Sequence, residues 1–347
     1  MSGQPLLGID RLRVEYPVRG RPPLRAVDDV TISIEPGETV GLVGESGSGK
    51  TTIASAVLGF VPAAAGSITF DGEDIIGASR DRRRLLSASL QVVFQNPYSS
   101  LNPARTIGKT LAETLRPHGS PPRAEVAEMV ASILDRVGLD PAAADRYPGQ
   151  FSGGQRQRIA IARALIAAPR LVICDEPVSS LDLSVQAQVL NLLRSLQAEL
   201  GLSYLFISHD LAVVRHISKR VVVLYRGRVM EAGPAAVVYS QPAHPYTRAL
   251  LQSVPVPNPD LQRARRAARQ RGVPDLADPV SPESCHFAPR CPWAADACRE
   301  RRPAAELTDR GALVACHRWR ELSALSHSAA GSRLLPLAVN PAVEVDR

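Results

Sequence analysis

Short apolar runs alternate with longer segments of helical spacing through much of the chain. ETVGLV at 38–43 and LVIC at 171–174 have the unbroken apolar character of strands that are buried on both faces. Apolar residues recur at helical spacing in VAEMVASILDRVGL at 126–139, and a further helix is predicted at 184–200. Buried strands that alternate with helices predict an α/β fold with a parallel sheet.

Turn formers and charges predict the elements in between. Asp71-Gly72 lies between two strand-like stretches in SITFDGEDI and predicts a hairpin. A second hairpin is predicted at 220–233, and the basic run at 80–84 predicts the exposed start of a helix. Residues 96–168 are expected to form a mostly helical subdomain.

The composition is that of a chain with a real core and about two domains. The 347 residues are 45% hydrophobic and 22% charged, as in soluble globular proteins. The N-terminus has no signal-peptide pattern, and the near-apolar run 54–65 is shorter than the roughly 20 residues that span a bilayer. The net charge of +7 comes almost entirely from arginine, which makes each of the three lysines, Lys50, Lys109 and Lys219, informative.

One of those lysines lies in a glycine-rich loop. GLVGESGSGKTT contains Gly44-x-x-x-x-Gly49-Lys50-Thr51, the spacing of a phosphate-binding loop between a strand and a helix. Backbone N–H groups and the helix dipole would surround a phosphate there. Lys50 would reach the terminal phosphates as a compact charge, and the Thr51 hydroxyl would bind Mg²⁺.

Two acids end the apolar run 171–174. Asp175 is placed to hold Mg²⁺, and Glu176 is placed to orient or deprotonate an attacking water. The plainer alternative is a strand followed by a solvated acidic turn.

FSGGQRQRIAIARAL at 151–165 contains a helix start with an unusual pair of glycines. Ser152 and Gln155 have the spacing of a capping box. Gly153 and Gly154 cost helix stability, but they let another backbone or a phosphate approach. This stretch resembles the signature of ATP-binding cassette (ABC) ATPases.

Other stretches follow in the order of that family, from about Tyr16 to Gly233. Gln95 in VVFQNP resembles the family's Q-loop, residues 179–182 its D-loop, and His209 its switch histidine. Tyr16 is placed like the aromatic residue that stacks on adenine.

The resemblance implies a RecA-like core, an antiparallel β subdomain and an α-helical subdomain, followed here by a small Cys-containing extension. It also implies a head-to-tail pair of cassettes, with each ATP held between one phosphate loop and the partner's signature. The catalytic residues that it implies are Glu176, His209 and Gln95. The ATP-binding residues that it implies are Tyr16, Gly44, Glu45, Ser46, Gly47, Ser48, Gly49, Lys50, Thr51, Thr52, Asp175, Ser152, Gly153, Gly154, Gln155 and Asp182. Mg²⁺ would be held by Thr51, Gln95 and Asp175.

A single phosphate loop, a single signature and no fused membrane segment indicate an ATPase subunit that serves separate membrane subunits. The stretches at 94–108 and 239–255 resemble those of dipeptide, oligopeptide and nickel importers. The resemblance therefore implies a motor for peptide import, peripheral to the membrane at its cytoplasmic face. The implied partners are a second ABC ATPase (a copy or a paralogue), two transmembrane permease subunits and, indirectly, an extracytoplasmic solute-binding protein.

Two other functions stay open at this point. The same motor could import nickel or another small solute, because the cargo never contacts this subunit. A soluble ATP-driven regulator or nucleic-acid remodeller is the distant alternative, suggested by the arginines at 261–272. Arginines without interleaved aromatic residues are typical of a solvated segment, so we expect no nucleic-acid partner.

The resemblance and the composition divide the chain into three parts. We expect the nucleotide-binding domain at 1–250, the importer extension at 251–325 and a disordered tail at 326–347.

Four of the five cysteines, Cys285, Cys291, Cys298 and Cys316, lie together in the extension. Disulfides are rare in cytosolic proteins, and zinc sites normally show closer C-x₂₋₄-C pairs. Four separated thiols suit an iron–sulfur cluster, and this stretch resembles the tails of peptide-importer ATPases that carry a [4Fe–4S] cluster. Zinc and a metal-free core remain the alternatives. Residues 281–320 hold few large apolar side chains, so a metal would serve as a staple.

Overall fold

The computed structural model describes residues 4–96, 101–116, 119, 121–253 and 281–327. The chain divides into two compact units, residues 1–219 with 226–228 and residues 220–225 with 229–347. The arginine-rich stretch 261–272 and, from residue 328 on, the tail that we expect to be disordered lie outside the described residues.

The first unit contains an antiparallel sheet with strand order β2-β1-β4-β5. Its strands are β1 (Leu7–Val18), β2 (Arg21–Ile34), β4 (Ala65–Phe70) and β5 (Glu73–Asp74). Asp71 and Gly72 join β4 to β5 with φ angles of 52° and 83°. Two positive φ angles are what a two-residue hairpin turn requires, and the predicted hairpin is confirmed.

Four parallel strands form the centre of the first unit in the order β3-β8-β7-β6. They are β3 (Thr39–Val43), β8 (Ser203–Ser208), β7 (Leu171–Asp175) and β6 (Leu90–Val93). Every residue of β3 and β8 is buried, as strands covered on both faces require. The helices α1 (Lys50–Leu58), α2 (Arg80–Ser89), α7 (Leu183–Leu200) and α8 (Leu211–Ile217) belong to the same unit.

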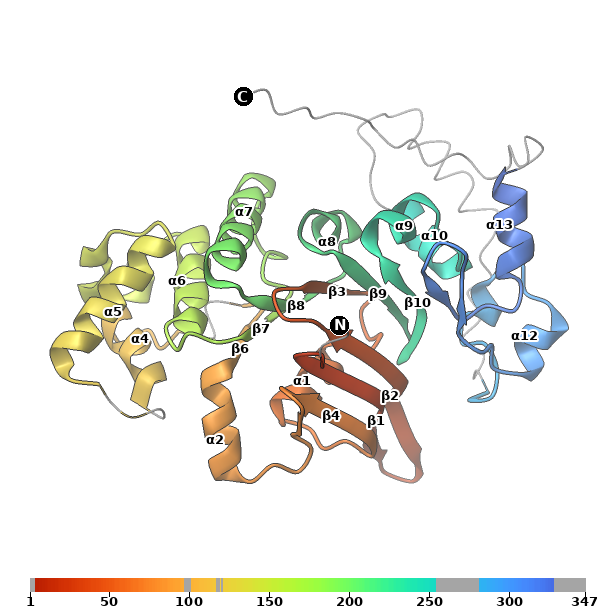
Figure 1. Cartoon of the computed structure of the whole chain (residues 1–347), viewed down its shortest axis with the longest axis horizontal. Helices are drawn as coiled ribbons and strands as arrows, with labels where there is room; N and C mark the ends of the chain where they lie inside the picture. Colours follow the sequence, from red (N-terminus) through yellow and green to blue (C-terminus); the bar gives the residue numbers. More distant parts are fainter. Residues whose placement is uncertain (1–3, 97–100, 117–118, 120, 254–280, 328–347) are drawn as a thin grey trace. The chain divides into compact units, whose positions relative to one another are not determined.

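The helical subdomain contains α4 (Ile107–Leu115), α5 (Arg123–Arg136) and α6 (Gly153–Leu165), with short 3₁₀ turns η2 (Pro141–Asp145) and η3 (Pro148–Gln150). Figure 1 shows the three α-helices gathered at the left of the view, beyond α7 and the strand β6. Arg158 joins two of them, because its guanidinium donates to the Val137 carbonyl at 3.0 Å.

The basic run at 80–84 begins α2, as predicted, and Ser79 caps the helix. Four of its arginine and aspartate side chains are exposed, but Arg83 is half-buried. Its guanidinium donates to the Val57 carbonyl at 2.9 Å and also to the Ile75 carbonyl. Arg83 therefore satisfies a carbonyl at the end of α1 that the helix itself leaves unpaired.

A buried ion pair fixes the turn at 226–228 within the first unit. Arg228 donates to Asp28 Oδ2 from Nε at 2.9 Å and from a terminal nitrogen at 2.6 Å. The two residues are 5% and 3% exposed. The Gly227 carbonyl also accepts from the Asp28 N–H, while the Gly227 N–H donates to the Ser48 carbonyl at 2.8 Å. This last bond joins the turn to Ser48 of the phosphate loop.

The second unit begins with β9 (Arg220–Tyr225), β10 (Arg228–Pro234) from Val229 on, α9 (Ala235–Ser240) and α10 (Pro245–Ser253). The extension adds η4 (Ala288–Arg290), α12 (Asp296–Glu300), β11 (Glu306–Leu307), β12 (Leu313–Val314) and α13 (Trp319–His327). Strand β12 pairs antiparallel with β10, with Glu231 opposite Val314. The extension is therefore joined to the preceding hairpin through backbone pairing.

Aromatic packing forms the core of this unit. The rings of Tyr225, Tyr246 and Phe287 lie with centroids 4.5–5.4 Å apart in tilted and edge-on contacts, which are favourable geometries for aromatic pairs. All three residues are buried. Phe287 thus anchors the cysteine-containing extension to α10 and the end of β9 by apolar burial.

A buried carboxylate organises the start of α10. Glu231 is fully buried, and it accepts from the N–H groups of Ala243 at 2.8 Å and His244 at 3.0 Å. His244 Nδ1 accepts from the Tyr246 N–H at 3.0 Å, and its ring also bonds the backbone of Ala315. Burial lowers the pKa of His244 to about 3, so the imidazole is neutral at pH 7.

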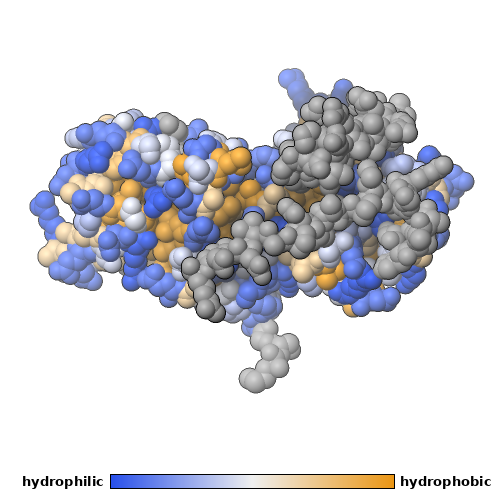
Figure 2. Space-filling view, turned by 90° about the horizontal axis from the view of Figure 1, so that it is seen from above, coloured by the Kyte–Doolittle hydropathy of each residue, from blue (hydrophilic) through white to orange (hydrophobic). Residues whose placement is uncertain are grey.

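No helix among the described residues is long and apolar enough to cross a membrane. On the face drawn in Figure 2, hydrophobic residues appear among hydrophilic ones.

Replacing Arg228 with Ala should lower the free energy of unfolding by up to about 3–5 kcal/mol, because the buried charge of Asp28 would lose its two hydrogen bonds from Arg228 and keep only Arg13, whose Nε lies 3.4 Å from Asp28 Oδ1, as an ionic partner. Chemical denaturation of the full chain measures this change. The matched control is Arg25→Ala, which removes an exposed pair with Glu15 and should cost less than about 1 kcal/mol. Equal losses in the two variants would contradict the assigned role of the Arg228–Asp28 pair.

Acidification should destabilise the second unit through His244. The unfolded chain takes up this proton below about pH 6.5, whereas the folded state resists protonation down to about pH 3. The neutral ring therefore contributes fully to stability above about pH 6.5, and this contribution is lost as the pH falls. At pH 5 the free energy of unfolding should be lower by about 2 kcal/mol. Trp293 and Trp319, the only tryptophans in the chain, both belong to this unit, so their fluorescence reports its unfolding.

His244→Gln should reduce the difference in stability between pH 7 and pH 5. The control His216→Gln changes an exposed histidine of α8 and should leave that difference unchanged. An undiminished pH dependence in His244→Gln would assign the effect to other groups.

Candidate functional site

The ends of the four parallel strands bring the predicted catalytic and Mg²⁺-binding residues together. The phosphate loop follows β3, Asp175 and Glu176 end β7, His209 follows β8, and Gln95 follows β6. Strand register places Val43 opposite Ser208 and Asp175 opposite Ile207. Because the strands are parallel, their carboxyl ends meet at one edge, where ligands bind in open α/β sheets.

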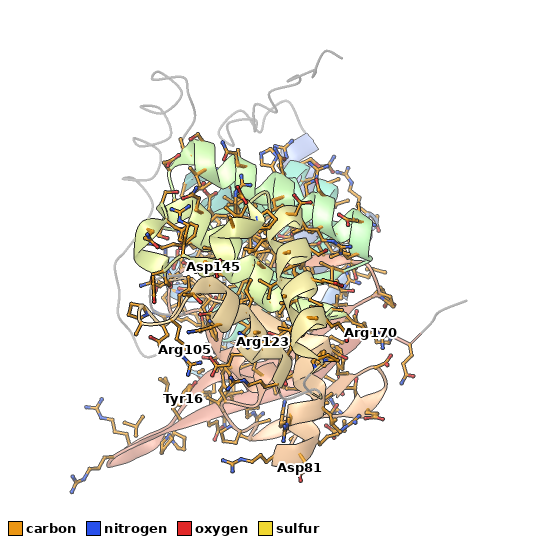
Figure 3. The ribbon with its side chains drawn as sticks, turned by 90° about the vertical axis from the view of Figure 1, so that its left-hand side faces the viewer. Tyr16, Asp81, Arg105, Arg123, Asp145 and Arg170 are labelled. Carbon is orange, nitrogen blue, oxygen red and sulfur yellow. The ribbon has the colours of Figure 1, made fainter. Side chains whose placement is uncertain are left out.

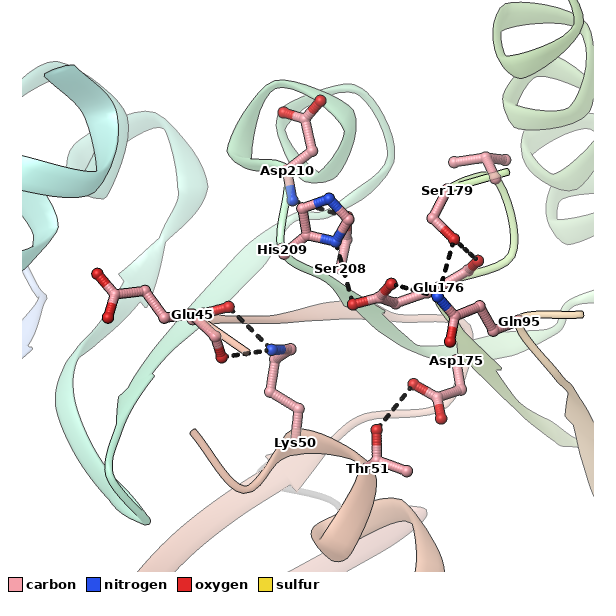
Figure 4. Close-up of polar contacts among 12 residues, drawn as sticks. Glu45, Lys50, Thr51, Gln95, Asp175, Glu176, Ser179, Ser208, His209 and Asp210 are labelled. Carbon is pink, nitrogen blue, oxygen red and sulfur yellow. Dashed lines mark hydrogen bonds and ion pairs between the residues drawn. The ribbon is translucent and has the colours of Figure 1, made fainter. Parts of the chain in front are cut away.

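Lys50 lies inside the phosphate loop and is 5% exposed. Its Nζ donates to the carbonyls of Gly44 at 2.8 Å and Glu45 at 2.9 Å, and approaches Ser48 Oγ at 3.5 Å (Figure 4). Burial lowers the pKa of Lys50, while the charges of Glu176, Asp175 and Glu45 act in the opposite direction. A buried ammonium ion held by carbonyls can turn toward a phosphate and form stronger, charge-assisted bonds.

Two glycines give the loop its shape. Gly47 and Gly49 have φ angles of 75° and 105°, which side chains disfavour. Gly49 also forms the N-cap of α1 and offers no side chain to the first N–H groups of the helix. Ser46 and Thr51 are exposed, and Thr52 is half-buried. The loop is therefore suited to an anion at the start of α1.

Thr51 and Asp175 form the second feature of the site. Thr51 Oγ1 donates to Asp175 Oδ1 at 3.4 Å (Figure 4). Burial raises the pKa of Asp175, and the hydrogen bond from Thr51 opposes that shift. A hydroxyl and a carboxylate beside a phosphate site are ligands that suit Mg²⁺.

Glu176 lies at the centre of the polar contacts in Figure 4. Its Oε1 lies 3.1 Å from His209 Nδ1, and its Oε2 accepts from Gln95 Nε2 at 3.0 Å. Each carboxylate oxygen therefore has its own partner. Glu176 has a φ angle of 47°, an uncommon conformation for a residue with a side chain.

The structure also shows how the signature stretch folds. Ser152 caps α6 by accepting from the Gln155 N–H, and Gln155 Oε1 accepts from the Ser152 N–H, so the predicted capping box is confirmed. A Cβ on Gly154 would lie 2.6 Å from Val185 on α7, whereas one on Gly153 would meet nothing nearer than 3.8 Å. Packing in this chain explains Gly154, whereas it would leave room for a Cβ at Gly153.

Two other predicted ATP-binding residues lie outside the contacts of Figure 4. Asp182 caps α7, because its Oδ1 accepts from the N–H groups of Ser184 and Val185. Tyr16 lies on the long hairpin of β1 and β2, opposite Leu24, and is 37% exposed (Figure 3). An exposed ring on this hairpin is available for stacking.

Ser179 joins the site, although the sequence suggested no role for it beyond its place in the D-loop-like stretch. Its Oγ donates to the Glu176 carbonyl at 3.1 Å and accepts from Gln95 Nε2 at 3.4 Å. A serine three residues after an acidic residue at a strand end is a local signal for such a turn.

The four clustered cysteines lie in the second unit and form no disulfide, and Cys174 is a buried thiol of β7, as expected for a core residue. Cys285 donates its N–H to the Cys298 carbonyl at 2.9 Å. Burial raises the pKa of Cys291 to about 12 and that of Cys316 to about 11. Among the residues that the structure describes, no three His, Cys, Asp or Glu side chains are arranged as ligands of a metal ion.

Two family models match the chain. Residues 27–179 match the ABC transporter model, and residues 230–298 match the model of the oligopeptide/dipeptide transporter C-terminal region.

Curated relatives resemble nearly the whole chain. The oligopeptide transport ATP-binding protein OppF of Salmonella typhimurium is 48% identical over 89% of this chain and 95% of its own length. OppF of Escherichia coli is 49% identical over 87% and 92%. A putative peptide import ATP-binding protein of Brucella ovis is 48% identical over 92% and 99%.

Solved structures of ATP-binding cassettes resemble about two thirds of the chain. The ATP-binding cassette MJ0796, solved as a dimer with ADP and Pi, has a TM-score of 0.60 at 27% identity and covers 66% of this chain and 98% of its own. CbiO1 from Clostridium perfringens, part of the ABC transporter complex cbiONQ, has a TM-score of 0.62 at 27% identity, covering 69% and 92%.

These similarities confirm the predicted ABC-type cassette fold. The chain belongs to the ABC transporter family of ATPases, in the group whose members carry the oligopeptide/dipeptide transporter C-terminal region.

Proposed function

We propose that this chain hydrolyses ATP to drive the import of peptides through separate membrane subunits. The observation that carries the proposal is the contact set of Glu176, Gln95 and His209 beside the phosphate loop. The chain that carries these contacts is 48% identical to an oligopeptide transport ATP-binding protein. This similarity supports peptides, rather than nickel or another solute, as the cargo.

ATP and Mg²⁺ would occupy the edge of the parallel sheet. Lys50 would exchange its carbonyl partners for the terminal phosphates, and the N–H groups at the start of α1 would surround them. Thr51, Asp175 and Gln95 would hold Mg²⁺ by their oxygen atoms, which are the ligands that this ion prefers. Bound Mg²⁺ offsets the negative charge of the phosphates.

Glu176 would act on the water that attacks the terminal phosphate. Its carboxylate is fixed from both sides by His209 and Gln95, so it can orient the water and accept its proton. His209 side-chain atoms are 56% exposed, and the ring would contact the same phosphate when ATP is bound.

A second cassette would complete each ATP site. Ser152, Gly153, Gly154 and Gln155 of the partner would approach the phosphates through the start of α6, whose dipole favours an anion. Packing within this chain would tolerate a Cβ at Gly153, so a role in approaching the partner's nucleotide would account for glycine there. Asp182 and Tyr16 would contribute at the cassette interface and at the adenine.

The remaining partners are proposed by analogy with the relatives. We propose two membrane permease subunits and, through them, an extracytoplasmic solute-binding protein, with this chain bound peripherally at the cytoplasmic face. The names of the relatives, which describe peptide import and oligopeptide transport, support these partners.

We also propose that Cys285, Cys291, Cys298 and Cys316 hold a [4Fe–4S] cluster. The four thiols lie in one unit, where a backbone hydrogen bond of 2.9 Å joins Cys285 to Cys298, and thiolates are the usual ligands of such clusters. A cluster spreads its ligands around a cube, so it needs no convergence on a single ion. Its role would be to stabilise the extension.

Glu176→Gln should lower the rate of ATP hydrolysis by roughly 100-fold or more, because an amide cannot accept the proton. ATP binding should persist, and the ATP-bound dimer should become longer-lived. Phosphate release and size-exclusion chromatography with ATP measure these effects. Glu199→Gln, which changes an exposed acid paired with Arg136, is the control and should hydrolyse ATP normally; full activity in Glu176→Gln would refute the role of Glu176.

Anaerobic purification of the full chain should yield iron and acid-labile sulfide in equal amounts. Cys316→Ser should reduce both, because it removes one ligand. The control Cys174→Ala changes a buried thiol of β7 and should retain both. A colourless protein with stoichiometric zinc, or with no metal, would overturn the cluster.

A further inference from the structure

We propose that Ser179 is a positioning residue that holds Glu176 in the backbone conformation needed for hydrolysis. The inference rests on the proposed role of Glu176 and adds a residue that governs it. Three observations carry it: the left-handed backbone of Glu176, the two bonds from Ser179 to its carbonyl, and the Gln95 amide that both residues share.

The backbone of Glu176 is strained. With φ at 47°, its Cβ lies close to backbone atoms that other conformations avoid. Such a conformation persists only where surrounding contacts hold it. The Glu176 N–H donates to the Ile207 carbonyl on β8 at 3.0 Å, which fixes one side of the residue.

Ser179 fixes the other side. Both its N–H and its hydroxyl donate to the Glu176 carbonyl, at 3.3 Å and 3.1 Å. The N–H bond alone closes an ordinary turn. The hydroxyl adds a second donor to the same oxygen, so rotation of the strained peptide would break two bonds at once.

The same hydroxyl reaches the carboxylate through Gln95. Gln95 Nε2 lies 3.0 Å from Glu176 Oε2 and 3.4 Å from Ser179 Oγ. Ser179 Oγ can accept this bond while it donates to the Glu176 carbonyl. The backbone and the side chain of Glu176 are therefore fixed by one hydroxyl and one amide.

The loop that carries Ser179 is itself held from α7. Gln186 Nε2 donates to the Val178 carbonyl at 2.8 Å and to the Leu181 carbonyl at 3.2 Å. These bonds flank Ser179 on both sides in the sequence. The serine hydroxyl is thus presented from a fixed loop, and its removal should act on Glu176 rather than on the loop.

Ser179→Ala in the full chain should lower kcat for ATP hydrolysis by roughly tenfold to 100-fold, the scale of a misplaced catalytic group. KM and the Kd for MgATP should stay within about twofold, because the phosphate loop is unchanged. Ser179→Thr keeps the hydroxyl and should restore most of kcat. Steady-state hydrolysis and titration with a fluorescent ATP analogue measure these values.

Ser87→Ala is the matched control. Ser87 Oγ donates to the Arg84 carbonyl three residues earlier, at 2.7 Å, which is the same spacing within α2 and outside the hydrogen bonds of the site. It should leave kcat unchanged. Full activity in Ser179→Ala, an equal loss in Ser179→Thr, or a loss of MgATP binding along with kcat would each overturn the proposal.

Glu176→Gln separates this inference from the proposed function. If that variant is active, the role of Glu176 fails and the function of the site must be reassigned. If it is inactive while Ser179→Ala is normal, only the positioning role fails.

Discussion

The parallel alignment of β3, β8, β7 and β6 is the constraint on which the site depends. Lys50, Gln95, Asp175 and His209 come from segments far apart in the sequence, and hydrogen-bonded register alone brings their strands to one edge. A parallel strand cannot slip by one residue without turning its buried side chains to the other face. Register that protects the core therefore also fixes the geometry of the site.

Charge balance at that edge explains why the nucleotide and its metal belong together. One buried lysine lies under the influence of three acids, Glu45, Asp175 and Glu176. Burial opposes the charged form of both Lys50 and Asp175. Phosphates alone would add negative charge beside the acids, whereas Mg²⁺ held by Thr51 and Asp175 would offset that charge. The site is thus suited to MgATP as a unit, which is consistent with the hydrogen bond that already joins Thr51 to Asp175.

Local features were predicted well from the sequence because their causes lie within a few residues. The Asp71-Gly72 turn, the Ser152–Gln155 capping box and the helix after the phosphate loop each follow from spacing and backbone preference. Contacts between distant segments were not predictable in this way. Asp28 and Arg228 are 200 residues apart, and no pattern near either one indicates the other.

Gly153 and Gly154 also show the difference between what local sequence predicts and what distant contacts decide. Their shared sequence context suggested one purpose, close approach of another group. Packing separates them, because Gly154 contacts Val185 across a helix pair that only the fold creates. Asp182 is similar: its capping of α7 is a local role that coexists with any role at a partner's nucleotide.

The extension has more structural support than its sequence suggested. We expected residues 281–320 to need a staple because they hold few large apolar side chains. Phe287 instead packs against Tyr225 and Tyr246, and β12 pairs with β10, whose Glu231 holds the start of α10. A fold supported in these ways does not depend on metal alone, unlike small domains that unfold without it. Loss of a cluster would then loosen the segments that carry the four cysteines while the aromatic core persists, so the stabilising role of a cluster would be confined to those segments.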